Sequence, residues 1–309
     1  MQKKNNIHGA ITIILAAIMW GVDGVILTPN LLNNKGIPLN VSFVVFILHL
    51  LPFIIMNFIW FNAYKKVKFF TLRDVLDLSL VALTGGALGT MCIVKALFLV
   101  NFQNLTIVAL LQKFQPIFAI ILSVIILKEK LSKKFYVLAS ITIIAGYIMT
   151  FSFDLPNKVS NNVIQAASLA LLAAFFFGTS TVLSKKVLKK YSPAESTFFR
   201  YGFTTIIAFL IVLFSNNLNV IYTVPTKTWI LFFIIAFTTG SGAILLYYNG
   251  LKHINAASSS IYELFFPITT AVLDYFINDN TMTWIQWVAA AIMVISIMQI
   301  SKLPSNVKN

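Results

Sequence analysis

The feature that most constrains this chain is a series of long apolar stretches that fills nearly all of its 309 residues. A helix needs about 20 mostly apolar residues to cross the hydrocarbon core of a bilayer. Ten stretches meet this requirement, and we expect one membrane-spanning helix in each. They run near residues 8–32, 38–63, 75–100, 103–127, 134–153, 162–188, 195–215, 228–251, 255–278 and 283–301.

Backbone chemistry and composition both favour helices over strands or a soluble fold. Backbone polar groups in lipid must be hydrogen-bonded internally, and these stretches lack the alternation that a transmembrane β-barrel requires. Only 10% of the residues are charged and 59% are hydrophobic, which leaves too few polar groups to cover a soluble domain. We therefore predict an all-α integral membrane protein with short loops and no soluble domain.

The positive charges predict the orientation of the chain. If the N-terminus is cytoplasmic, 17 of the 23 Lys and Arg residues fall in cytoplasmic segments and only Lys35, Lys158 and Lys227 fall outside. Cytoplasmic loops carry such an excess in multi-pass proteins. We expect both termini in the cytoplasm and a location in the plasma membrane, which is the inner membrane of a two-membrane cell. The net charge of +14 then indicates contact with membrane lipids, and we expect no nucleic-acid partner.

The two halves of the sequence resemble each other. Pro116 aligns with Pro267 at an offset of 151 residues, and Gly86 aligns with Gly240. Each half contains five expected spans, and an odd number inverts the second half relative to the first. Inverted repeats are a recurring device of secondary transporters, with the substrate site near the midplane. We expect a first five-helix repeat at 1–153, a linker at 154–161 and a second five-helix repeat at 162–309.

Several short motifs occur in an order that is typical of one transporter family. Trp20-Gly21 lies in the first span, Ala96-Leu97 ends the third, and Glu129 follows the fourth. Together with the duplicated proline, this order resembles the drug/metabolite transporter superfamily, in particular its EamA-like ten-helix branch, over about residues 8–301. The resemblance implies a small-molecule carrier. Asn280 departs from the pattern, since it stands where Glu129 predicts an acid, and the substrate stays open.

Six charged residues fall inside the expected spans, although one charge at mid-bilayer costs at least ~2.5–3.5 kcal/mol. They are Asp23, Lys95, Lys113, Arg200, Glu263 and Asp274. Counting from the span ends places Asp23, Lys113 and Glu263 deepest, with His49 at a similar depth. We expect these four residues to line a substrate cavity, although a buried ion pair that only fixes helix packing is the alternative. We expect Arg200 near the inner end of its span, where its side chain reaches toward the interface.

We further expect Lys113 to pair with Asp23, which leaves Glu263 as the exposed carboxylate of the cavity. Such a carboxylate suits either proton coupling or recognition of a substrate ammonium group. Pro116 and Pro267 each disrupt the hydrogen bond to the carbonyl four residues earlier. Those carbonyls belong to Gln112 and Glu263, so both fourth helices of the repeats should kink beside a polar side chain, either to form a ligand site or only for packing.

Aromatic side chains complete the expected cavity, although aromatics at mid-span more often serve packing. The expected walls for an organic substrate are Trp20, Tyr247, Tyr248 and Tyr262. The enzyme classes find no support, because the chain carries no HExxH, Walker or GxSxG motif. Its three histidines lie far apart and it has one cysteine. We expect no catalytic residue, no metal and no cofactor.

The sequence therefore predicts a secondary transporter that moves a small polar organic metabolite by alternating access. An amino acid or a related compound is favoured, because the deep region offers charges of both signs. One alternative is an efflux carrier for drugs or cationic compounds, and another is a membrane-embedded lipid transferase or scramblase. Both a monomer and a homodimer are compatible with the sequence.

Overall fold

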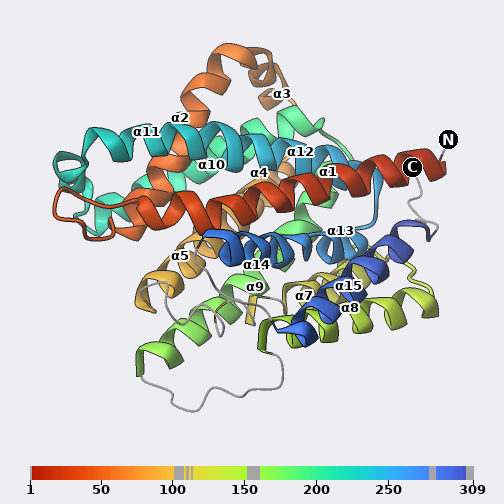
Figure 1. Cartoon of the computed structure of the whole chain (residues 1–309). Coiled ribbons are helices and arrows are strands. Elements are labelled where there is room, and N and C mark those ends of the chain that lie inside the picture. The colour runs from red at the N-terminus through yellow and green to blue at the C-terminus, as the bar shows by residue number, and fades with distance from the viewer. Residues whose placement is uncertain are drawn as a thin grey trace.

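The computed structural model describes residues 2–100, 108, 111–112, 114–151, 161–277 and 283–303 (Figure 1). Within these residues the regular structure is helical, apart from one isolated bridge between Leu32 and Pro38. The all-α prediction is confirmed for the described part of the chain.

The helices follow the expected spans closely. In chain order the longer segments are α1 (Gln2–Val22) with η1 (Asp23–Leu27), α2 (Val41–Ile59), α4 (Leu72–Val81) with η4 (Ala82–Leu88) and α5 (Gly89–Leu99), α7 (Gln115–Ile126), α8 (Lys133–Phe151), α9 (Asn161–Val187), α10 (Pro193–Phe214), α11 (Thr226–Ile235) with η6 (Ala236–Gly240) and α12 (Ser241–His253), α13 (Ala256–Tyr262), α14 (Phe265–Ile277) and α15 (Trp284–Ser301). Short helices are α3 (Tyr64–Val67), η2 (Thr28–Asn30), η3 (Phe61–Ala63) and η5 (Leu218–Thr223).

Eight segments among the described residues are long and apolar enough to cross a membrane. They are Asn6–Asn30, Val41–Ile59, Leu72–Leu99, Ile164–Val187, Pro193–Phe214, Thr226–His253, Ala256–Ile277 and Trp284–Ser301. The expected fourth span falls partly outside the described residues. Its described part contains the 12-residue apolar helix α7, which is shorter than a full span. Helix α8 occupies the expected fifth span. The total of ten spans therefore stays a prediction.

Local sequence fixes where several spans begin. Capping boxes pair Thr71 with Asp74 before α4, Ser192 with Glu195 before α10, and Thr283 with Gln286 before α15. In each box a hydroxyl and an acidic or amide side chain satisfy backbone N–H groups that the first helical turn leaves free. These caps hold the polar ends of the spans in defined positions.

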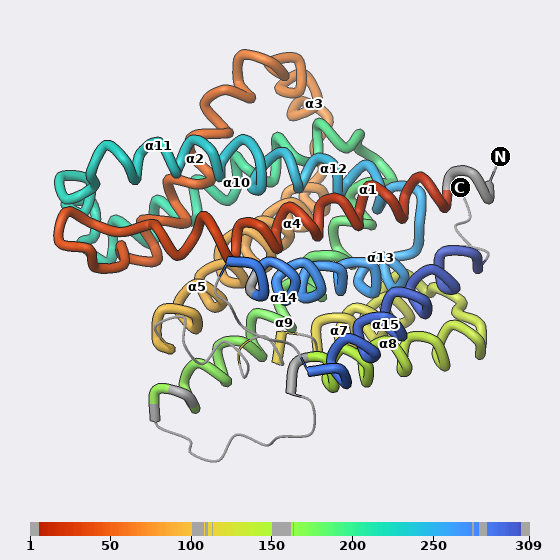
Figure 2. The backbone as a smooth tube through the Cα atoms, in the orientation of Figure 1, coloured from red at the N-terminus to blue at the C-terminus, as the bar shows by residue number. Residues whose placement is uncertain are grey.

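Each long helix packs against one or more others that are distant in sequence (Figures 1 and 2). Helix α1 packs against α12 and α14, and α9 packs against α5 and α7. Helix α2 packs against α10, and α8 packs against α15. Helix α1 begins and α15 ends at the same end of the bundle (Figure 1).

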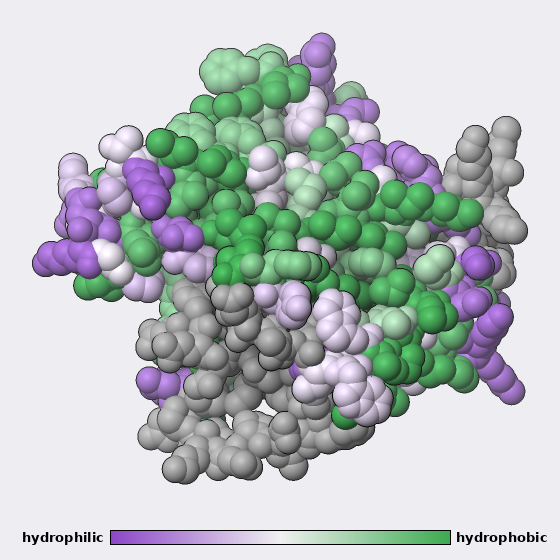
Figure 3. All heavy atoms as spheres, in the orientation of Figure 1, coloured by the Kyte–Doolittle hydropathy of each residue, from purple (hydrophilic) through white to green (hydrophobic). Residues whose placement is uncertain are grey.

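Large apolar side chains lie on the surface of this bundle as well as in its interior. Phe58 and Phe214 are more than four-fifths exposed, at 83% and 82%, whereas Ala16, Ala170 and Ala173 are fully buried. Small residues allow membrane helices to approach closely, and large apolar side chains are then left to face lipid. Figure 3 shows apolar residues along the sides of α1 and α12 and polar residues gathered at the left and right ends.

Candidate functional site

Three spans depart from regular α-helix in the middle of the bundle. The first span ends in η1, and the third and eighth are interrupted by η4 and η6, all three with π-helical geometry. Such π segments occur frequently at functional sites. At Gly86 in η4, an added Cβ would lie 2.0 Å from Thr204 Oγ1, so α10 approaches η4 closely only because this position is glycine.

Glu263 lies at a break between α13 and α14, four residues before Pro267. Gln115 Nε2 donates a hydrogen bond to Glu263 Oε2 at 2.6 Å, and Tyr247 Oη donates to Oε1 at 2.8 Å. The carboxylate therefore joins α7 and α12 at the point where the ninth expected span loses its helical geometry.

Tyr247 extends this network to further helices. Its hydroxyl lies 2.8 Å from Thr181 Oγ1 on α9 and accepts from Ser259 Oγ on α13 at 3.1 Å. The Trp20 ring of α1 lies 5.5 Å from the Tyr247 ring, centre to centre. We call Trp20, Gln115, Thr181, Tyr247, Ser259 and Glu263 the central network. It combines a carboxylate, an amide, three hydroxyls and two aromatic faces.

A second polar cluster lies beside the central network and contains Ser184 of α9, Arg200 of α10 and Tyr248 of α12. Tyr248 Oη is 2.9 Å from Ser184 Oγ, and Arg200 Nη1 donates to the same oxygen at 3.1 Å. Arg200 is 7% exposed, so its side chain packs inside the bundle and does not extend along the surface. The reason is that Tyr248 supplies both an acceptor and a ring face, with the guanidinium carbon 5.8 Å from the ring centre.

The predicted site residues occupy different surroundings. Glu263 and Trp20 belong to the central network, and Tyr262 is buried immediately before the break. The amide that reaches Glu263 belongs to Gln115 rather than to Gln112, which is half-buried. The sequence does not single out Gln115, because Pro116 draws attention to the carbonyl four residues earlier and not to the side chain beside it.

Asp23 and His49 make contacts with residues outside the central network. Thr28 Oγ1 donates to Asp23 Oδ1 at 3.1 Å. His49 Nδ1 lies 2.8 Å from the Val45 carbonyl oxygen, and its ring is 5.0 Å from that of Tyr201. Lys113 lies outside the described residues, so its pairing with Asp23 stays a hypothesis. Among the described residues no group of three or more His, Cys, Asp or Glu side chains is placed to hold a metal.

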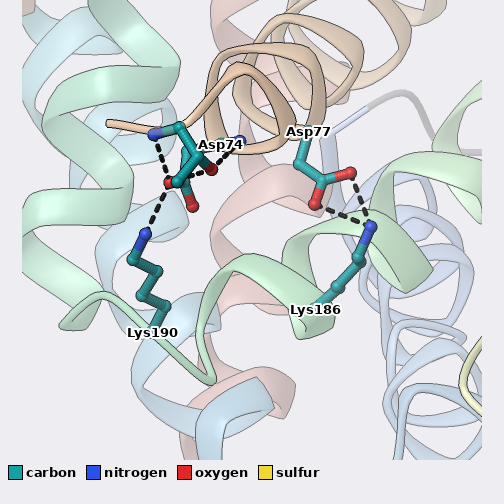
Figure 4. A network of polar contacts seen from close by, with 5 residues as sticks. Asp74, Asp77, Lys186 and Lys190 are labelled. Carbon is teal, nitrogen blue, oxygen red and sulfur yellow. Dashed lines mark hydrogen bonds and ion pairs between the residues drawn. The ribbon is translucent and has the colours of Figure 1, made fainter. Parts of the chain in front are cut away.

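Ion pairs join α4 to α9 at one end of the bundle (Figure 4). Lys186 Nζ is 2.7 Å from Asp77 Oδ2, and Lys190 Nζ is 2.5 Å from Asp74 Oδ2. The hydrogen bond with Asp74 raises the pKa of Lys190 above its ordinary value. The four residues border a cleft of about 180 Å³, which is smaller than ordinary ligand pockets.

At the same end, two charged side chains bind the backbone where α12 gives way to α13. The Glu129 carboxylate accepts from Ala256 N at 2.8 Å and from Ala257 N at 3.3 Å. Lys185 Nζ donates to the carbonyl oxygens of Leu251 and Lys252, at 2.8 and 3.0 Å. An acid at a helix start and a base at a helix end both complement the helix dipole. We call Asp74, Asp77, Glu129, Lys185, Lys186 and Lys190 the latch.

Long apolar helices that enclose a polar network indicate a multi-pass membrane protein. The particular family follows from sequence comparison, because the model of the EamA-like transporter family matches residues 7–152 and again residues 164–302. This chain belongs to the EamA-like transporter family. It is therefore a transporter of small molecules and not an enzyme, as the sequence predicted.

Individual relatives agree with this assignment. The riboflavin transporter ImpX of Fusobacterium nucleatum is 48% identical over 301 residues, covering 97% of this chain and 99% of that protein. An uncharacterized transporter of Synechocystis is 22% identical, covering 94% and 85% of the two chains. A crystal structure at 12% identity superposes with a TM-score of 0.65 over 94% of both chains, which supports the fold.

Proposed function

We propose that this chain transports riboflavin, or a flavin closely related to it, across the plasma membrane. The support is the riboflavin transporter that is 48% identical over 97% of the chain. The amino acid favoured by the sequence finds no support in the comparisons. The deep lysine on which that choice partly relied, Lys113, lies outside the described residues.

The central network is the observation that carries the proposal. Riboflavin has a flat aromatic ring system, an imide edge with one N–H between two carbonyls, and a chain of hydroxyls. Trp20 and Tyr247 offer aromatic faces, and aromatic pairs prefer offset or edge-to-face contacts. Glu263 offers acceptors for the imide N–H, and Gln115 offers a donor for a neighbouring carbonyl. A site of this kind is mainly apolar with a few placed polar groups, as ligand sites generally are.

We further propose that transport proceeds by alternating access between two inverted repeats. The packing supports this proposal, because the major helix contacts of one half have counterparts in the other half. Contacts of α1 with α12 and α14 correspond to contacts of α9 with α5 and α7. The π segments η4 and η6 correspond in the same way. Transporters of this type rock one repeat against the other around a central site.

The latch indicates the side of the membrane toward which the proposed conformation is closed. We assign the latch end to the cytoplasm because the lysines of the sequence cluster there, as the positive-inside rule requires. Both termini would then be cytoplasmic. The ion pairs and backbone contacts tie α4 and Glu129 of the first half to α9 and α13 of the second half. The carrier is therefore proposed to be closed toward the cytoplasm, and opening requires these contacts to separate.

Reconstituted protein tests the transport proposal. Purified chain in proteoliposomes should exchange external radiolabelled riboflavin for internal unlabelled riboflavin. Tyr247→Phe removes the hydroxyl that Glu263, Thr181 and Ser259 share, and it should slow this exchange by at least tenfold. The matched control is Tyr222→Phe, because Tyr222 is 84% exposed. Exchange no faster than in empty liposomes would refute flavin transport.

A further inference from the structure

Arg200 is the most unusual buried group that the proposed transport site leaves unexplained. It is one of two arginines in the chain and lies in the span Pro193–Phe214 with 7% of its surface exposed. Among the described residues it forms no ion pair with a carboxylate. A guanidinium in the membrane-spanning region normally pairs with an opposite charge or marks a substrate path.

Its hydrogen bonding is incomplete. Nη1 donates to Tyr248, whereas the buried Nε has no hydrogen-bond partner. A guanidinium carries five N–H donors and never accepts, so the tyrosine satisfies only a small part of it. A specific unsatisfied buried donor in a folded protein is rare and calls for an explanation.

The Arg200 side chain lies against η4, the π-helical segment of the third span. A Cβ on Gly85, in η4, would lie 2.9 Å from Arg200 Nη2 and 2.1 Å from Ser180 Oγ. Only glycine therefore allows the guanidinium and the serine to lie against the π segment. Arg200 also lies close to the central network, because its partner Tyr248 adjoins Tyr247, with ring centres 5.9 Å apart.

We propose that Arg200 determines the charge selectivity of the carrier by binding an oxygen acceptor of the substrate. This inference rests on the proposed flavin transport. A fixed buried cation attracts carbonyl or anionic oxygens and repels a substrate cation, so one residue supplies both attraction and exclusion. The carrier accordingly takes neutral or anionic flavins and rejects cationic ones, which opposes the cationic-efflux alternative.

Binding of two flavins to detergent-purified protein tests the assignment, with quenching of flavin fluorescence as the signal. The probes are riboflavin and a flavin that bears a trimethylammonium group at the end of its N10 side chain. Arg200→Gln should weaken riboflavin binding about 10- to 100-fold, as expected for a hydrogen bond from a charged group. It should also narrow the preference for riboflavin over the cationic flavin by at least tenfold.

Two further variants separate recognition from packing. Arg200→Lys retains the charge without the planar fork, so it should keep the preference against the cation while riboflavin binds more weakly. Arg73→Gln removes the other arginine, which is exposed, and should leave both affinities unchanged. An equal loss of affinity for both flavins in Arg200→Gln, or riboflavin binding within threefold of the original, overturns the inference. Failure of the original protein to bind riboflavin would instead refute the flavin proposal, and this inference with it.

Discussion

Replacing Glu129 should open the carrier toward the latch end. The Glu129 carboxylate binds two backbone N–H groups at the start of α13, at 2.8 and 3.3 Å. Removing a helix cap costs about 1 kcal/mol, and losing a negative charge at a helix start costs about 0.3–1 kcal/mol more. With the range of cap energies included, Glu129→Ala should shift the closed-to-open equilibrium by roughly 1–3 kcal/mol, or roughly 5- to 150-fold.

Glu129→Gln should have a smaller effect. Glutamine keeps one acceptor and loses only the charge, which corresponds to about 0.3–1 kcal/mol and a roughly 2- to 5-fold shift. The graded order from Glu to Gln to Ala is itself part of the prediction, because a general loss of folding would not separate the two variants by these factors.

Labelling of a buried reporter cysteine measures the shift. Cys92→Ser provides the background, and Ser180→Cys places a thiol on α9 at a position that is 3% exposed. An impermeant thiol reagent added at the latch end should label it in proportion to the open population. Gln286→Ala is the matched control, since Gln286 caps its own helix α15. Equal labelling rates with and without Glu129→Ala would refute the proposed role of Glu129. An equal rise in the control variant would refute it as well.

Three further predictions address the membrane interior. Glu263→Gln should abolish riboflavin accumulation driven by a pH gradient and still allow exchange; unchanged accumulation would exclude Glu263 as the coupling group. Asp23→Asn alone should impair transport more than Asp23→Asn combined with Lys113→Gln, because the single change strands a buried charge; equal effects would argue against the pair. Pro267→Ala should reduce transport more than expression, since it permits a backbone hydrogen bond at the break after Glu263; normal transport would make the proline incidental.

The fold was largely predictable because the bilayer imposes one requirement on every span. Apolar length alone located eight described spans to within a few residues, since backbone groups in lipid leave helices as the default. Span depth was less informative for side chains. It did not show that Glu263 binds Gln115 and Tyr247, or that Arg200 is buried against Tyr248.

The contacts between distant residues were not predictable from one sequence. Gln115 reaches Glu263 across 148 positions, and Glu129 reaches Ala256 across 127. Such pairs depend on how the halves pack, and periodicity within a single helix carries no information about that. Glu129 was recognised as part of a motif, but its role as a cap for another helix required the structure.

These two long-range contacts also connect the site to the latch. Two contacts reach the broken helix formed by α13 and α14, one near each end of α13. Gln115 of α7 binds Glu263 after α13, and Glu129, which follows α7, binds the start of α13. A ligand shifts a conformational equilibrium only by binding one state more tightly than the other. A flavin that takes over the hydrogen bond from Gln115 to Glu263 would release the first of these contacts and leave Glu129 as the remaining tie. We therefore expect substrate to accelerate opening at the latch end, and to do so at least as strongly once Glu129→Ala has released the remaining tie.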